Sequence, residues 1–148
     1  MIIGFTGTRE GMTLAQKEVV AYLLRNIEMK SFIDHVSHGD CIGADADFDE
    51  IASKMNIVRW AYPSNISSMR AHTEDRGAIL AIEPRPPLER NVMISVGAKY
   101  LIACTKSPDE QVRSGTWHAV RCARKNKTTI YIVFPDGTLK VESSARAV

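Results

Sequence analysis

The sequence predicts one α/β domain with a mainly parallel sheet of about five strands and helices on both faces. Short apolar runs typical of buried strands alternate along the chain with segments of helical periodicity. The length of 148 residues, with 45% hydrophobic and 24% charged residues, matches an ordinary globular domain that buries a core without disulfides. We therefore expect residues 1–148 to form a single domain.

The expected elements follow one another in a regular order. Ile2–Thr6 is a short buried strand that ends at Gly7, and Thr13 is the expected N-cap of a helix whose apolar residues keep helical spacing. The remaining strands are expected at 32–37, 57–62, 100–104 and 129–134, and the remaining helices at 43–55, 88–96 and 115–125. This alternation predicts a Rossmann-like fold, in which ligands bind beyond the carboxyl ends of the strands.

Two stretches depart from the alternation. Residues 64–87 are polar and rich in proline, and such a long loop in a compact domain is usually functional or disordered. After the turn at 135–137, residues 138–141 predict a short antiparallel edge strand. The last residues are polar or small and are expected to be frayed.

Charge and cysteine content narrow the function classes. A formal net charge of +2 is too small to indicate a nucleic-acid partner by itself. Cys41, Cys104 and Cys122 lie far apart without a zinc-binding spacing, so no metal and no resident cofactor are expected. Without a signal peptide or an apolar run of membrane length, we expect the protein to work in the cytoplasm, away from membranes.

Two loops near the start of the chain are candidate ligand-binding segments. After the first strand, Gly7 permits close approach of the backbone, Thr8 offers a hydroxyl and Arg9 can pair with a phosphate. In the second loop, His38–Asp45, the small residues Gly43 and Ala44 are expected to expose free amides at a helix start. Asp45 suits a ribose hydroxyl and the helix dipole equally well, and His38 is either a base-stacking residue or, by slight preference, a satisfied loop histidine.

Two later segments complete the candidate site. Arg113, Ser114, Gly115 and Thr116 form a helix start at which a phosphate would meet free amides and a guanidinium, and Trp117 is expected to pack beneath it. Arg90 and Asn91 lie on an otherwise apolar helix, so they are expected to face either the ligand cleft or a subunit surface. The apolar positions of the same helix, Leu88, Val92 and Val96, could supply the interface of a homodimer or higher homo-oligomer.

Taken together, these motifs resemble the SLOG superfamily, which joins DprA to the LOG-type phosphoribohydrolases. The residues that carry the resemblance are Gly4–Arg9, His38–Asp45, Leu88–Asn91 and Arg113–Trp117, with Arg121, Ala123 and Arg124 behind them. The similarity extends from Ile2 to about Val133 and is greatest to small single-domain members, related to YspA and cpYpsA, that are called DprA-like in bacteriophage genomes. A bacterial or phage origin and a nucleotide or nucleotide-sugar pocket are what the resemblance implies.

The resemblance also bears on catalysis. In LOG-type enzymes an arginine on a helix works with a glutamate that follows the Gly-Thr of the phosphate loop. Arg90 falls where that arginine is expected, but His118 and Ala119 occupy the glutamate positions. Neither side chain can supply the carboxylate that stabilises or captures a ribosyl centre. Nucleoside deoxyribosyltransferases carry a nucleophilic glutamate in a similar segment, and the same positions after Gly115-Thr116 hold no glutamate here. The sequence therefore favours a protein that is not an enzyme of either type.

Three functions remain, in this order. The first is a module that binds a nucleotide or an ADP-ribose-like phosphate ligand without LOG-type turnover, for sensing or sequestering a nucleotide signal. The second is a hydrolase of N-glycosidic bonds that uses a substitute acid. The third is a DprA-like recombination protein that binds single-stranded DNA through a basic helix end. The candidate acids are Asp40, Asp45, Asp109 and Glu110, and the basic residues are Arg121, Arg124, Lys125 and Lys127.

Overall fold

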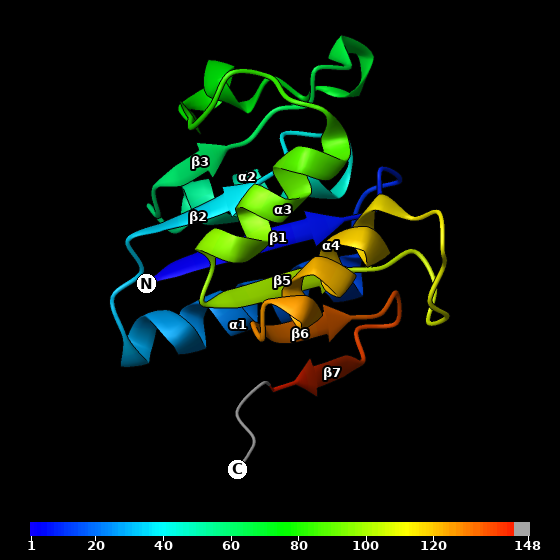
Figure 1. The fold of residues 1–148 in the computed structure, drawn as a ribbon. Coiled ribbons are helices and arrows are strands. Elements are labelled where there is room, and N and C mark those ends of the chain that lie inside the picture. Colours follow the sequence, from blue (N-terminus) through cyan, green and yellow to red (C-terminus); the bar gives the residue numbers. More distant parts are fainter. Residues whose placement is uncertain (144–148) are drawn as a thin grey trace.

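A computed structural model describes residues 1–143 as a seven-stranded sheet of order β4-β3-β2-β1-β5-β6-β7 (Figure 1). All neighbouring strands pair in parallel except β6 and β7, which are antiparallel. The strands are β1 (Ile2–Gly7), β2 (His35–His38), β3 (Arg59–Ala61), β4 (Ile79–Leu80), β5 (Tyr100–Cys104), β6 (Thr129–Val133) and β7 (Leu139–Glu142). Because the chain continues from β1 to β2 on one side and later to β5 on the other, the strand order reverses beside β1.

Helices cover both faces of this sheet. In Figure 1, α3 and α4 lie in front of the strands and α1 and α2 lie behind them. The helices are α1 (Leu14–Lys30), α2 (Ala44–Lys54), α3 (Pro87–Gly97) and α4 (Gly115–Lys125), with short 3₁₀ turns η1 (Ser67–Met69) and η2 (Thr73–Arg76). Thr13 caps α1 in a capping box with Gln16, as expected from the sequence. No helix within residues 1–143 is long and apolar enough to cross a membrane.

Each face of the sheet has its own apolar core. Behind the sheet, Phe5 of β1 stacks on Phe48 of α2, with ring centroids 4.2 Å apart. In front of it, Trp117 and Val120 of α4 pack against β5 and β6. A Cβ atom at Gly4 would lie 3.1 Å from the side chains of Ile94 in α3 and of Ala98, which follows α3, so this glycine lets α3 pack closely against β1. The close packing brings the N-terminal half of α3 to the carboxyl edge of the sheet.

The predicted fold class is confirmed, but the predicted number of strands is too low. The antiparallel edge strand that the sequence indicates at 138–141 is present as β7. The additional strand, β4, lies in the segment 64–87 that was expected to be a loop. It has only two residues, is half-exposed at the edge of the sheet and pairs with β3 alone, so it carries no hydrophobic pattern that reveals it. The expected fraying at the end of the chain concerns mainly residues 144–148, which lie outside the described residues.

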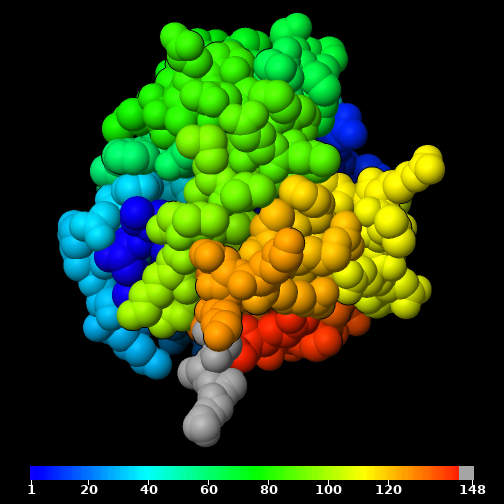
Figure 2. Space-filling view, in the orientation of Figure 1, coloured from blue at the N-terminus to red at the C-terminus, as the bar shows by residue number. Residues whose placement is uncertain are grey.

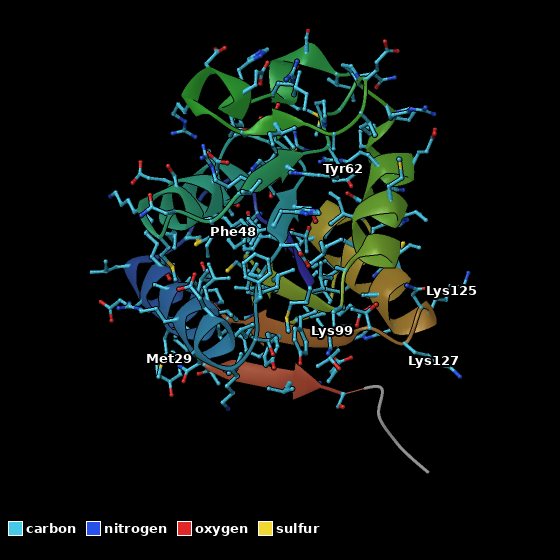
Figure 3. The ribbon with its side chains drawn as sticks, turned by 90° about the vertical axis from the view of Figure 1, so that its left-hand side faces the viewer. Met29, Phe48, Tyr62, Lys99, Lys125 and Lys127 are labelled. Atoms are coloured by element: carbon cyan, nitrogen blue, oxygen red, sulfur yellow. The ribbon has the colours of Figure 1, made fainter. Side chains whose placement is uncertain are left out.

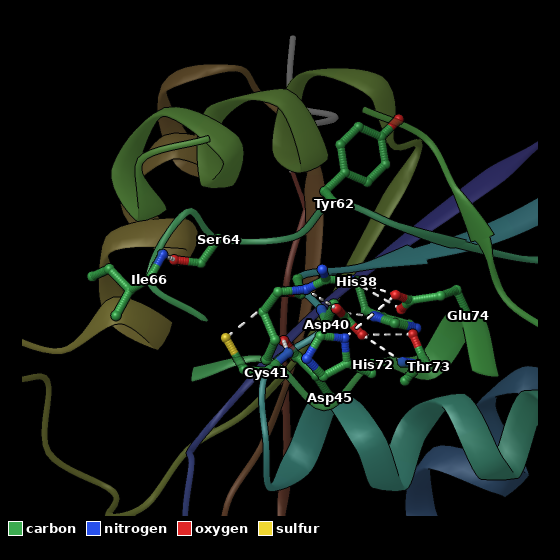
Figure 4. A network of polar contacts seen from close by, with 12 residues as sticks. His38, Asp40, Cys41, Asp45, Tyr62, Ser64, Ile66, His72, Thr73 and Glu74 are labelled. Carbon is green, nitrogen blue, oxygen red and sulfur yellow. Dashed lines mark hydrogen bonds and ion pairs between the residues drawn. The ribbon is translucent and has the colours of Figure 1, made fainter. Parts of the chain in front are cut away.

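Asp40 anchors the segment after β3 to the loop after β2 (Figure 4). Its carboxylate accepts hydrogen bonds from the backbone amide and the hydroxyl of Thr73, at 2.8 and 2.7 Å, and from Nε of Arg70, at 2.9 Å. Burial would raise the pKa of Asp40, but these hydrogen bonds outweigh it and lower the pKa. Much of the region expected to be a long loop is therefore held in place by a buried carboxylate.

A second buried ionic cluster lies beside the first. His38 is fully buried, with Nε2 at 2.9 Å from Asp49 Oδ1 and Nδ1 accepting from the backbone amide of Asp40. Arg59 of β3 donates to both oxygens of Asp49 at 3.0 and 3.2 Å. His38 is thus a satisfied structural histidine, which was the preferred interpretation, and it has no access to a ligand.

Candidate functional site

A cavity of about 370 Å³ lies at the carboxyl edge of the sheet, where the strand order reverses. Its walls come from the loops that follow β1, β2 and β5 and from the first turns of α3 and α4. Figure 2 shows the loop 105–114, in yellow, projecting beside the N-terminal segment at this edge. All four predicted segments contribute side chains to the cavity.

The loop after β1 rests on the start of α2. A Cβ atom at Gly7 would lie 2.5 Å from Ala44 Cβ, and the carbonyl of Thr8 accepts a hydrogen bond of 2.9 Å from the amide of Ala44. Gly7, Thr8 and Arg9, which are predicted to bind the ligand, all line the cavity. The Arg9 side chain is exposed at the mouth and has no ion pair within residues 1–143.

Gly43 and Ala44 have a different role from the one predicted. The Ala44 amide is not free, because it donates to Thr8, and neither residue lines the cavity. Gly43 has φ of +95°, and a Cβ atom there would lie 2.3 Å from the carbonyl oxygen of Arg9. The two small residues therefore allow the β1 loop to lie directly on the helix start, which positions Thr8 and Arg9.

Asp45 points back from α2 into the cavity. It is only 5% exposed, and its Oδ2 accepts a hydrogen bond of 3.1 Å from the amide of Cys41. Burial raises the pKa of Asp45. Burial, with Asp45 close by, also raises the pKa of Cys41 to about 11, so the Cys41 thiol is neutral at physiological pH and is no activated nucleophile.

Arg90 reaches the cavity from α3 on the opposite side. Its guanidinium lies over Gly39, where a Cβ atom would be 1.4 Å from Nη1. Arg90 is 5% exposed, yet its contacts are the carbonyls of Pro87 and Tyr62, at 3.3 and 3.4 Å, and the Cys41 sulfur at 3.1 Å. Within residues 1–143 no carboxylate lies within 4.0 Å of it to form an ion pair. Asp45 is close enough for its charge to interact with that of Arg90, but the two side chains form no direct ion pair, which leaves N–H groups of Arg90 available to a ligand.

Asn91, beside Arg90, connects α3 to α4. Its Nδ2 lies 3.4 Å from the carbonyl of Gly115 and 3.3 Å from Nδ1 of His118. Both Arg90 and Asn91 line the cavity, so the cleft is where this polar pair points. The apolar residues of the same helix, Leu88, Val92 and Val96, are exposed.

The first turn of α4 presents unpaired donors to the cavity. Ser114 is the N-cap, as predicted, and its hydroxyl accepts from the amide of Trp117 at 3.2 Å. The amides of Gly115 and Thr116 have no acceptor within residues 1–143, and both residues line the cavity together with Arg113. Trp117 is 4% exposed and packs in the core beneath this turn, which confirms its predicted position.

The positions where LOG-type enzymes have a glutamate carry no acid here. Ala119 lines the cavity, and His118 lies against Asn91 and Cys122. Of the four candidate substitute acids, only Asp45 lines the cavity, since Asp40 binds Arg70 and Glu110 pairs with two arginines of α4. Glu10 also lines the cavity, at 3.1 Å from Lys106.

The sequence did not indicate several residues of the cavity wall. Gly39 lies in the candidate segment His38–Asp45, but only the structure shows that its missing side chain makes room for Arg90. Met69 comes from the segment expected to be a loop, and its carbonyl accepts from the amide of Ile42 at 2.9 Å. Lys106 and Gln111 lie in the loop before α4, where no local pattern separates a cavity residue from a solvated one.

No protein-family model and no curated protein matches the chain. Its fold is similar to that of the molybdenum cofactor binding protein from the phototrophic bacterium Rippkaea orientalis, with a TM-score of 0.66 and 19% identity over 90% of this chain and 76% of that one. It is also similar to DNA processing protein A (DprA) from Helicobacter pylori, whose structure is described for its single-stranded DNA binding mode, with a TM-score of 0.61 and 16% identity over 89% and 64% of the two chains. DprA from Streptococcus pneumoniae gives a TM-score of 0.62 and 14% identity over 88% and 49%. At these identities the likeness concerns the fold, which is consistent with the SLOG-type architecture that the motifs imply.

Proposed function

We propose that the cavity binds a nucleotide or nucleotide-derived phosphate ligand and holds it without LOG-type turnover. The observation that carries the proposal is Arg90, a buried guanidinium that lines the cavity and forms no ion pair within residues 1–143. Arg9, Arg113 and the free amides at the start of α4 line the same cavity. A phosphate would neutralise these donors together, and a module of this kind suits the sensing or sequestering of a nucleotide signal.

The charge of the cavity supports an anionic ligand. Its lining holds four cationic side chains and two acidic ones. One of the acids, Glu10, is already paired with Lys106, which leaves three arginines with no ion pair in the described part of the chain. A volume of about 370 Å³ lies within the usual range of small-molecule pockets, about 300–1,000 Å³, and at its lower end. Charge and size together favour one compact phosphate ligand.

The DNA-binding alternative rests on residues that are placed less favourably. Arg121 and Arg124 pair with Glu110, and Arg124 pairs also with Glu142. Lys125 and Lys127 are exposed, but they lie at the amino-end side of the sheet, the side that faces the viewer in Figure 3. A strand bound there would not reach the cavity, so we rank this function below the first.

A crystal structure with sulfate or a nucleotide tests the phosphate position. We expect a phosphate or sulfate oxygen within hydrogen-bond distance of the Gly115 and Thr116 amides, because these donors have no acceptor in the protein. A ligand bound elsewhere, with this helix start empty, would contradict the assignment.

A second function, hydrolysis of an N-glycosidic bond, is favoured by one observation. Asp45 is the only candidate substitute acid that lines the cavity, and Arg90 lines it too. We nevertheless expect no release of free base from nucleoside monophosphates above the uncatalysed rate, since the first turns of α4 hold Ala119 where a carboxylate is required. Chromatography of the reaction mixture measures this. Base release that disappears in both Arg90→Ala and Asp45→Ala variants would establish the hydrolase instead.

A further inference from the structure

Asp45 has one carboxylate oxygen engaged and one available. Oδ2 accepts from the amide of Cys41, whereas Oδ1 has no hydrogen-bond partner within residues 1–143. The side chain is 5% exposed and lines the cavity. Because Asp45 lines the cavity, this free oxygen can accept a hydrogen bond from a ligand there.

Arg90 faces the same space with donors to spare. Its three contacts to the protein are two long hydrogen bonds to carbonyls and one to a thiol, so a guanidinium with five N–H groups keeps unused donors. Asp45 and Arg90 are both buried and both line the cavity, yet they form no ion pair with each other. A group that fits between them must donate to a carboxylate and also accept from a guanidinium. An alcohol does both, whereas a phosphate cannot donate to Asp45.

Asp45 and the expected phosphate position lie on different walls of the same cavity. The start of α2 lies against the loop after β1, and α4 follows β5, the next strand of the sheet. Asp45 and the Gly115 and Thr116 amides nevertheless line one cavity of about 370 Å³. A ligand whose phosphate lies at the start of α4 can therefore present its sugar to Asp45 within the same cavity.

We propose that Asp45, with Arg90, binds a ribose hydroxyl of the ligand and makes the cavity selective for ribonucleotides over deoxyribonucleotides. This inference rests on the proposed function, because it assigns the sugar once the phosphate lies at the first turn of α4. The hydroxyl donates to Asp45 Oδ1 and accepts from Arg90. The burial that raises the pKa of Asp45 also means that the charged carboxylate gains from such a donor.

The test uses probes with and without a base. Calorimetric titration measures the binding of two kinds of probe. The first are ribonucleoside 5′-monophosphates with their 2′-deoxy and 3′-deoxy counterparts, and the second are ribose 5-phosphate and 2-deoxyribose 5-phosphate. Removal of one hydroxyl is expected to weaken binding about 10- to 100-fold in the wild-type protein, the range for a hydrogen bond to a charged group. In Asp45→Ala this difference should fall to about threefold or less, because the affinity for the ribose form drops to that for the deoxy form.

Two further variants keep the result interpretable. Asp45→Asn serves if Asp45→Ala fails to fold, because the asparagine oxygen can still accept from the Cys41 amide while the other position becomes a donor. Asp47→Ala is the matched control, since Asp47 lies on the same helix and accepts from the amide of Met12 but does not line the cavity. It should retain the full ribose preference.

The outcomes separate this inference from the proposed function. Equal binding of ribo and deoxy probes by the wild type, or a preference that survives in both Asp45 variants, overturns the ribose assignment and leaves phosphate binding intact. Failure of every probe, including ribose 5-phosphate, overturns the proposed function and this inference with it. A ribose preference that is lost only in the Asp45 variants supports the assignment.

Discussion

A Gly39→Ala variant is expected to fold normally and to lose most of its affinity for a phosphate ligand. The new Cβ would lie 1.4 Å from Nη1 and 2.5 Å from Cζ of Arg90, so the guanidinium must leave its position. It would also lie 2.9 Å from Oδ2 of Asp45. Since Arg90 is held by weak contacts to the protein, its displacement costs little stability. The site loses a charge-assisted donor, and we expect the dissociation constant to rise about 10- to 100-fold.

This variant changes no charge, so its effect comes from the displacement of Arg90 and from the close contact with Asp45. The free energy of unfolding should change by no more than about 1 kcal/mol, because Gly39 does not have the positive φ that disfavours alanine. Gly97→Ala is the control, since a Cβ atom there has no neighbour within 4 Å. Titration with a nucleoside monophosphate and a denaturant melt measure the two quantities. Wild-type affinity in Gly39→Ala would mean that Arg90 does not contact the ligand.

Replacing Arg9 or Arg113 by alanine is expected to have the second large effect. Both side chains are exposed at the mouth of the cavity, on the loops after β1 and β5, and neither has an ion pair within residues 1–143. Each substitution should cost about 1.5–3 kcal/mol of nucleotide binding, the usual contribution of a hydrogen bond to a charged group. Stability should hardly change, because no contact within the protein is lost. Calorimetric titration measures the affinities. If neither variant loses affinity, the ligand does not contact the mouth of the cavity.

Local patterns predicted the elements that carry strong periodicity. The helix at 115–125 and the strand at 100–104 have the predicted bounds, because each combines a clear apolar pattern with a clear terminus. The second strand is shorter than predicted, since Phe32 is exposed before the chain reaches the sheet. The segment 64–87 resisted prediction because Asp40, far away in the sequence, holds it in place. A contact between distant residues leaves no trace in local periodicity.

At the candidate site too, local patterns predicted some features and missed those that depend on contacts between distant residues. Twelve residues at strand ends and helix starts were predicted to bind a phosphate ligand, and ten of them line the cavity, whereas ligand binding itself stays a prediction. Gly43 and Ala44 do not, because small residues at a helix start serve close backbone packing as readily as anion binding. Sequence patterns identify which amides are without helical partners, but they do not show which of them a neighbouring loop already occupies.

The central claim is that the protein binds a compact phosphate ligand in the cavity and not a DNA strand at the basic end of α4. One titration series tests this claim most directly. Wild type, Arg113→Ala and a Lys125→Ala/Lys127→Ala double variant are titrated with a nucleotide panel and with fluorescent single-stranded DNA at several salt concentrations. We predict saturable nucleotide binding that is lost in Arg113→Ala and kept in the double variant, because the two lysines lie at the opposite end of the strands. Tight DNA binding that falls steeply with salt, depends on the two lysines and is accompanied by no nucleotide binding would contradict the claim.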